Sequence, residues 1–163
     1  MSDLQTNILL QDLLQLLRSR RLTIGFAESC TGGLLSATVT ALSGVSDVFL
    51  GSIVSYSNAA KMAVLGVEES VLKNEGAVSE TVALQMAQGA RKQLKVEVSL
   101  AITGIAGPTG GTPTKPVGTV CFAVSGPGVA ESTLRKHFTG DRNEIQQASV
   151  RFAISYLNSV LEI

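Results

Sequence analysis

Short apolar segments alternate with amphipathic segments along the first two thirds of the chain. The apolar segments are rich in Val, Ile, Phe and Tyr, which is typical of strands, and cover residues 22–28, 47–57 and 96–104. The segments around them carry Leu, Ile or Ala at helical spacing and cover residues 4–18, 31–44, 58–66 and 79–94. Strands joined through helices lie parallel in one sheet, with helices on both faces. The alternation therefore predicts an α/β fold, a three-layer α/β/α sandwich.

The last third of the chain predicts a hairpin followed by a helix. Residues 117–126 and 128–138 are apolar and β-prone, and the Gly-Pro-Gly sequence at their junction favours a tight turn. The hairpin makes the expected sheet mixed, although still mostly parallel. In the helix that follows, over residues 141–163, Asp141 and Glu144 have the spacing of a capping box.

Two earlier helices have their own start signals. Asn58 is the expected N-cap of the helix over residues 58–66, and Ser79 is the expected N-cap of the next long helix. Residues 70–76 fit either a short turn of helix or a loop.

Composition and charge argue against several classes of protein. The chain has 163 residues, the size of one domain, and we expect a single domain over residues 1–163. Thirteen Lys and Arg balance thirteen Asp and Glu, and only 4% of the residues are aromatic, which argues against a nucleic-acid surface. No apolar stretch is long enough to cross a membrane, and the first residues lack a signal-peptide pattern. We therefore expect a cytoplasmic protein that binds neither nucleic acid nor membrane.

The two cysteines, Cys30 and Cys121, have neither the spacing of metal ligands nor that of a disulfide framework. Cys121 lies within a predicted strand and is expected in the core. No other segment offers a convincing metal site, and no metal is expected.

Short polar residues and glycines collect where the predicted strands end. In open α/β sheets, ligands bind in the crevice beyond the carboxyl ends of the strands. The segments that leave strands there, and that hold many of these residues, are 28–33, 55–61, 102–111 and 138–142. Any one of them alone is a weak signal, but together they predict a ligand-binding crevice.

Ser29 lies at the first of these strand-to-helix junctions. There its hydroxyl can project into the crevice, and the N–H groups of the following helix's first turn can form an oxyanion hole worth about 3 kcal/mol per donor. The same residues also fit a plain helix cap with glycines for close packing. Glu28 is equally ambiguous, because it can orient a base or simply lie near a positive helix end.

A serine nucleophile needs a proton acceptor, and the one histidine, His137, lies among basic residues in a predicted strand and is expected at the surface. Lys61 is the alternative, one helical turn after Asn58 and surrounded by Ala, Met and Val. Burial among such residues disfavours the ammonium, and a basic Lys61 requires a pKa lowered to near neutrality. A surface lysine on an amphipathic helix is the competing interpretation.

The remaining polar segments suit a ligand with a ring and an anionic group. Tyr56 offers an aromatic face and a hydroxyl. The Gly/Pro/Thr-rich segment 105–116 is a predicted loop, not a Walker A motif, whose N–H groups can converge on an anion. Arg142, at the start of the last helix, suits a phosphate. An ordinary strand tyrosine and a purely structural loop remain open alternatives.

Several of these motifs together resemble the CinA C-terminal domain family, over nearly the whole chain from about residue 8. They are AESCTGG at 27–33, YSNAAK at 56–61, GAVSE at 76–80, ITGIAGPTGGTPTKPVGTV at 102–120 and GDR at 140–142. The resemblance implies hydrolysis of nicotinamide mononucleotide (NMN) to nicotinic acid mononucleotide and ammonia, a step of pyridine nucleotide salvage and NAD biosynthesis. In longer members this domain follows a molybdopterin-binding-like domain, so the chain looks like the stand-alone form.

The resemblance also implies which residues act. Ser29 and Lys61 match the family's catalytic Ser/Lys pair, with no cofactor. Tyr56, Thr103 and Arg142 match further active-site positions of the family. The other residues expected to bind substrate lie in the same motifs: Glu28, Cys30, Thr31, Gly32, Asn58, Gly104 and Gly107. NMN is the expected partner, and a homodimer formed through the first helix is a reasonable expectation.

The sequence leaves two alternatives open. The chain could be a non-catalytic module that binds a nucleotide or phosphate, because glycine-rich loops would form a similar pocket without chemistry. Cys30, next to Ser29 and intrinsically more reactive, could instead be the nucleophile.

Overall fold

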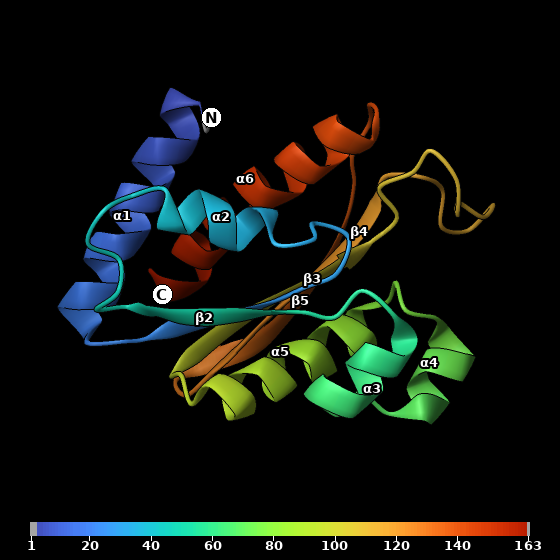
Figure 1. The fold of residues 1–163 in the computed structure, drawn as a ribbon, viewed down its shortest axis with the longest axis horizontal. Coiled ribbons are helices and arrows are strands. Elements are labelled where there is room, and N and C mark those ends of the chain that lie inside the picture. Colours follow the sequence, from blue (N-terminus) through green and yellow to red (C-terminus); the bar gives the residue numbers. More distant parts are fainter. Residues whose placement is uncertain (1–2, 163) are drawn as a thin grey trace.

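Five strands form one twisted sheet between two layers of helices in the computed structural model, which describes residues 3–162 (Figure 1). The strands are β1 (Ile24–Glu28), β2 (Phe49–Val54), β3 (Val98–Gly104), β4 (Thr119–Gly126) and β5 (Val129–His137). Their order across the sheet is β2-β1-β3-β4-β5. β1 pairs in parallel with β2 and β3, whereas β4 is antiparallel to both β3 and β5. The predicted mixed sheet and three-layer α/β fold are confirmed.

Helices cover both faces of the sheet (Figure 1). One layer consists of α1 (Leu4–Arg20), α2 (Leu34–Thr40) and α6 (Arg142–Leu161), and the other of α3 (Asn58–Leu65), α4 (Glu69–Glu75) and α5 (Glu80–Leu94). Two apolar clusters fill the spaces between the layers, one centred on Phe26, Leu100 and Phe122 and the other on Ala101 and Met86. Among residues 3–162, no helix is long and apolar enough to cross a membrane.

Local sequence signals placed most helix starts correctly. Asp141 and Glu144 form the expected capping box of α6, and the Ser79 side chain caps α5. The prediction of Asn58 as the cap of α3 is wrong. The side chain of Ser57 accepts the hydrogen bond from the Ala60 N–H, because Ser57 has the extended backbone of an N-cap and Asn58 is already helical.

Helix α2 begins later than its apolar periodicity predicts. The expected helix covered residues 31–44, but residues 29–33 form a turn and the regular helix begins at Leu34 and ends at Thr40, four residues before the expected end. Gly32 and Gly33 have φ values of +57° and +99°, in the left-handed region that favours glycine and that a helix does not use. This turn separates Ser29 from the helix.

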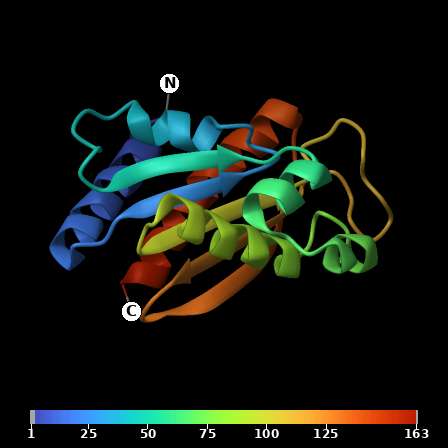
Figure 2. The same cartoon turned by 60° about the horizontal axis from the view of Figure 1, so that its bottom comes forward.

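The carboxyl ends of β1, β2 and β3 meet at one edge of the molecule, as Figure 2 shows, beside α3, α4 and the loop 105–116. The parallel pairing of these three strands produces this arrangement, because each of them arrives from a helix at the opposite end. The polar segments singled out above therefore come together at one edge of the sheet, where the crevice was expected.

Candidate active site

Ser29 and Lys61 meet at the end of β1. The Ser29 N–H donates to the Ile102 carbonyl oxygen at 3.0 Å, which extends the sheet pairing by one residue and holds the serine at the rim. Lys61 lies on the first turn of α3, and its Nζ is 2.9 Å from Ser29 Oγ. The side chains are separated by 32 positions in the sequence and are brought together only by packing of α3 against the sheet edge.

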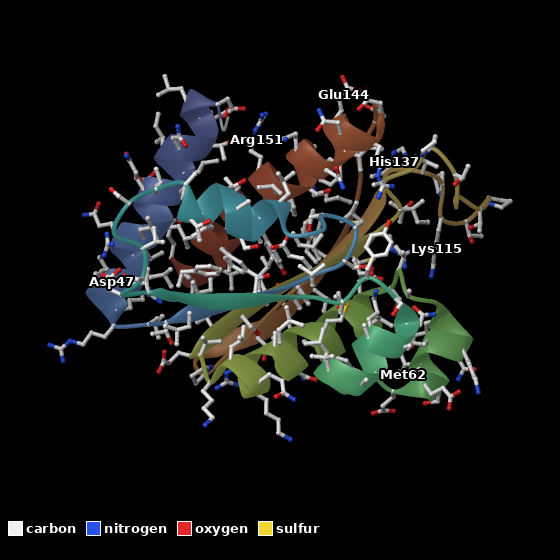
Figure 3. The ribbon with its side chains drawn as sticks, viewed as in Figure 1. Asp47, Met62, Lys115, His137, Glu144 and Arg151 are labelled. Atoms are coloured by element: carbon white, nitrogen blue, oxygen red, sulfur yellow. The ribbon has the colours of Figure 1, made fainter. Side chains whose placement is uncertain are left out.

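Helix α3 is turned so that its lysine faces inward. Lys61 is 1% exposed, whereas its apolar neighbours Met62 and Val64 are 36% and 42% exposed. Figure 3 shows Met62 on the outer side of α3. The alternative of a surface lysine is therefore wrong, and an orientation that buries an amine while exposing methionine and valine does not serve stability.

The contacts of Lys61 suit a neutral amine. Besides Ser29 Oγ, its Nζ lies 2.8 Å from the Ser55 carbonyl oxygen and 3.4 Å from that of Tyr56. An ammonium can donate to all three oxygens. A neutral amine can instead donate to the two carbonyls and accept the Ser29 hydroxyl proton with its lone pair. Burial lowers the pKa of Lys61 below its usual 10.5, which favours this form.

Glu28 closes the start of α2. Its side chain is fully buried. Its carboxylate accepts hydrogen bonds from Thr31 Oγ1, Gly33 N, Leu35 N, Ser36 N, Ser36 Oγ and Ser52 Oγ. The carboxylate therefore caps the helix, and no hydrogen bond among the described residues joins it to Lys61. Each carboxylate oxygen accepts three of these hydrogen bonds, so neither is left to bind a ligand.

The expected oxyanion donors, the first-turn N–H groups of a helix predicted to begin at Thr31, are only partly available, because Glu28 accepts from Gly33, Leu35 and Ser36. The donors that remain belong to the turn itself, which closes through a hydrogen bond from Gly32 N–H to the Ser29 carbonyl oxygen at 3.1 Å. Within residues 3–162, the N–H groups of Cys30 and Thr31 have no acceptor in another residue. They are the donors left beside Ser29.

The Cys30 side chain is packed into the core. It is 5% exposed and belongs to the apolar cluster on the α6 side of the sheet. Burial raises the pKa of Cys30 to about 12, so the thiol stays protonated at neutral pH. Both features favour Ser29 over Cys30 as the nucleophile.

Tyr56, Gly107 and Arg142 lie together at the outer part of the crevice. Arg142 Nη2 donates to Tyr56 Oη at 3.0 Å and its Nη1 donates to the Gly107 carbonyl oxygen at 2.7 Å. The arginine thus links the segment after β2 to the loop 105–116. Gly107 has a φ of +79°, and a Cβ there would lie 2.5 Å from Val117 Cγ1, so this position requires glycine.

Other predicted residues take different positions. Thr103 is buried, and its hydroxyl donates to the Ala77 carbonyl oxygen at 2.8 Å, which ties β3 to the segment before α5. Gly104 packs against β4, where a Cβ would lie 2.8 Å from Val120 Cγ2. Asn58 is exposed on the first turn of α3. The exposed His137 lies at the end of β5 and contacts the Val117 carbonyl oxygen, as predicted for a surface histidine (Figure 3).

The sequence matches the profile of the CinA C-terminal domain over residues 6–161. The chain belongs to the CinA C-terminal domain family. Two CinA-like proteins, from Thermotoga neapolitana and Prochlorococcus marinus strain MIT 9301, are 45% and 48% identical over 92% and 91% of this chain. The matched region is 36% of each of those proteins, so the chain spans only about a third of the length of these CinA-like relatives.

Solved CinA structures have the same fold. A CinA superfamily protein from Klebsiella pneumoniae superposes with a TM-score of 0.92 and 35% identity, covering 96% of this chain and 98% of that one. The competence/damage-inducible protein CihA from Agrobacterium tumefaciens gives 0.91 and 36%, covering 98% of both chains. These names place the chain among CinA proteins without stating a reaction.

Sequence reasoning missed two polar residues of this CinA site. Ser55 Oγ is buried and has no hydrogen-bond partner among the described residues. Glu28 pairs with Val54 on one side and with Ile102 on the other. The residues that follow these three, Ser29, Ser55 and Thr103, therefore lie at one level along the strand direction. The register of parallel strands could have indicated Ser55.

The second missed residue is Gln146. Its Nε2 donates to the Cys30 carbonyl oxygen at 2.8 Å, from one turn after Arg142 on α6. The spacing of four residues places both side chains on one face of α6 and was the available signal. Among the described residues, no group of three or more His, Cys, Asp or Glu side chains is arranged to hold a metal ion.

Proposed function

We propose that this chain is an amidohydrolase that converts NMN to nicotinic acid mononucleotide and ammonia, as a step of pyridine nucleotide salvage. The observation that supports the chemistry is the 2.9 Å contact between Ser29 Oγ and a buried Lys61 Nζ. Such a pair can activate a serine without histidine. The motifs shared with the CinA C-terminal domain supply the expected substrate.

In the proposed mechanism, neutral Lys61 removes the hydroxyl proton of Ser29 as Ser29 Oγ attacks the carboxamide carbon. The N–H groups of Cys30 and Thr31 hold the negative oxygen of the tetrahedral intermediate. Lys61 then returns the proton to the departing nitrogen, and ammonia leaves an ester on Ser29. Water attacks this ester with Lys61 again as the base, which releases the acid and restores the serine.

The outer residues suit the rest of NMN. In the proposed complex, the cationic pyridinium ring lies against the face of Tyr56, which is 63% exposed. A positive ring near Lys61 lowers the pKa of the amine further by like-charge repulsion. Arg142, already held by Tyr56 Oη and the Gly107 carbonyl oxygen, binds the 5′-phosphate with its remaining N–H donors.

Incubation of the purified chain with NMN tests this function directly. We expect equal amounts of ammonia and nicotinic acid mononucleotide, measured by an enzyme-coupled ammonia assay and by chromatography. NMN binding detected by calorimetry without either product would instead support the non-catalytic nucleotide-binding module.

Replacing Arg142 by alanine should raise KM for NMN on the order of tenfold, because hydrogen bonds to charged groups contribute about 1.5–3 kcal/mol each. The value of kcat/KM for nicotinamide riboside, which lacks the phosphate, should change much less. Steady-state kinetics with both substrates measures this difference. Arg20→Ala, at an exposed position on α1, is the matched control. An equal loss for both substrates would contradict a phosphate role for Arg142.

A further inference from the structure

The Gln146 side chain is the one group outside the turn 29–33 whose hydrogen bond holds the Cys30 carbonyl in the described structure. Its Nε2 lies 2.8 Å from that oxygen, across 116 positions of sequence. Gln146 is half-buried between α6 and the turn. Because this hydrogen bond is made to the residue next to Ser29, Gln146 can fix the geometry of the turn that carries the nucleophile.

The Cys30 carbonyl and the Thr31 N–H belong to the same peptide group, so a hydrogen bond to the carbonyl also orients the N–H. The peptide is planar, and in a trans peptide the C=O and the N–H point in opposite directions. The one cis peptide recorded within the described residues is Gly107–Pro108, so the peptide between Cys30 and Thr31 is trans. When Gln146 fixes the Cys30 carbonyl, it also fixes where the Thr31 N–H points.

The other parts of the turn are held by hydrogen bonds to residues of the turn itself or to the end of β1. The Ser29 carbonyl accepts from Gly32 N–H, which fixes the direction of the Cys30 N–H in the same way. The Thr31 side chain is bound to Glu28 at 2.8 Å. The peptide between Cys30 and Thr31 depends on Gln146 instead.

We propose that Gln146 is a positioning residue for the oxyanion hole, acting through the Cys30 carbonyl to aim the Thr31 N–H at the substrate's carbonyl oxygen. This inference rests on the proposed acyl transfer to Ser29. Arg142 lies four residues earlier on the same face of α6. The helix therefore ties the part of the crevice that takes the phosphate to the turn that stabilises the intermediate.

The test compares Gln146→Ala and Gln146→Glu with Gln147→Ala and Gln147→Glu, the same changes at an exposed neighbour. A glutamate at 146 keeps the length but, when ionised, has no N–H to donate and repels the Cys30 carbonyl. We expect kcat for NMN to fall about 10- to 100-fold in both Gln146 variants. This decrease does not exceed the one that follows removal of a complete oxyanion-hole donor, because the Thr31 N–H is misdirected and not removed. KM should stay within about threefold, since the substrate's ground-state contacts remain. The Gln147 variants should match the wild type.

A second readout uses pyridine-3-boronic acid, whose adduct with a serine hydroxyl is tetrahedral and carries oxygen where the oxyanion forms. Calorimetry should show weaker binding to the Gln146 variants, by a factor similar to their loss in kcat, and wild-type binding to the Gln147 variants. Ser29→Ala shows whether the boronate reacts at Ser29. A purely structural role for Gln146 would lower thermal stability without this selective loss.

The outcomes separate the inference from the proposed function. If the wild type hydrolyses NMN and the Gln146 and Gln147 variants behave alike, or if only KM changes, the inference is wrong and the function stands. If the wild type releases no ammonia but binds the boronate through Ser29, and the Gln146 variants bind it more weakly, the inference stands without the function. If the wild type neither hydrolyses NMN nor binds the boronate, both fall.

Discussion

Replacing Lys61 by methionine is expected to lower kcat for NMN hydrolysis by about 10²- to 10⁴-fold, the usual contribution of a general acid or base. Methionine has a similar length and fits the apolar surroundings of α3, but it has no lone pair basic enough to accept the Ser29 proton. The loss should appear in kcat and in kcat/KM alike, because proton transfer is needed only in the transition state.

The same substitution should also change how stability depends on pH. Burial lowers the pKa of Lys61 from its usual 10.5, so between the lowered pKa and 10.5 the unfolded chain binds a proton that the folded chain does not. The free energy of unfolding of the wild type therefore rises with pH across this window. Lys61→Met lacks this contribution, so its stability relative to the wild type should be highest at low pH and fall as the pH approaches 10.5.

Steady-state kinetics and urea denaturation between pH 6 and pH 10 measure both effects. Lys92→Met, a change of an exposed lysine on α5, should leave turnover as in the wild type. Near-normal turnover by the Lys61 variant, or stability curves that run parallel across the window, would contradict the proposed state of this amine.

Ser29→Ala should lose at least as much activity as Lys61→Met, since it removes the nucleophile itself.

Replacing Glu28 by alanine is expected to lower the free energy of unfolding by at least about 3 kcal/mol. The change leaves the buried N–H of Leu35, the buried hydroxyl of Thr31 and the half-buried N–H of Ser36 without their acceptor, and each unsatisfied buried group costs about 1–3 kcal/mol. Turnover should fall as well, because the turn that carries Ser29 loses its attachment to α2. Glu28→Gln keeps the volume and one acceptor oxygen and should lose less.

Urea denaturation measures the stability change, with Glu68→Ala as the matched control. Glu68 occupies the N-cap position of α4, but its side chain makes no capping hydrogen bond, so its removal should change stability by less than about 0.5 kcal/mol. Equal effects of the two substitutions would mean that the bonds to the Glu28 carboxylate contribute little to folding.

The two glutamates at helix starts show how far sequence reasoning could go. Glu28 and Glu68 both precede helices, and an acid near a positive helix end is a sound expectation for each. The structure buries Glu28 completely with six donors and leaves Glu68 exposed. The difference comes from β1, which directs Glu28 toward α2 and Ser52, and no local pattern contains that information.

The sequence by itself determined the α/β class, the alternation of strands and helices, the Ser79 and Asp141 caps, and the gathering of polar segments at one edge of the sheet. These features follow from the order of the elements and from spacings within a few residues, which local periodicity reveals. Tertiary structure alone decided that Lys61 faces inward, that Glu28 takes most of the N–H groups at the start of α2, and that Gln146 reaches the Cys30 carbonyl. Those contacts join atoms from different layers of the sandwich, so their geometry exists only once the layers have packed.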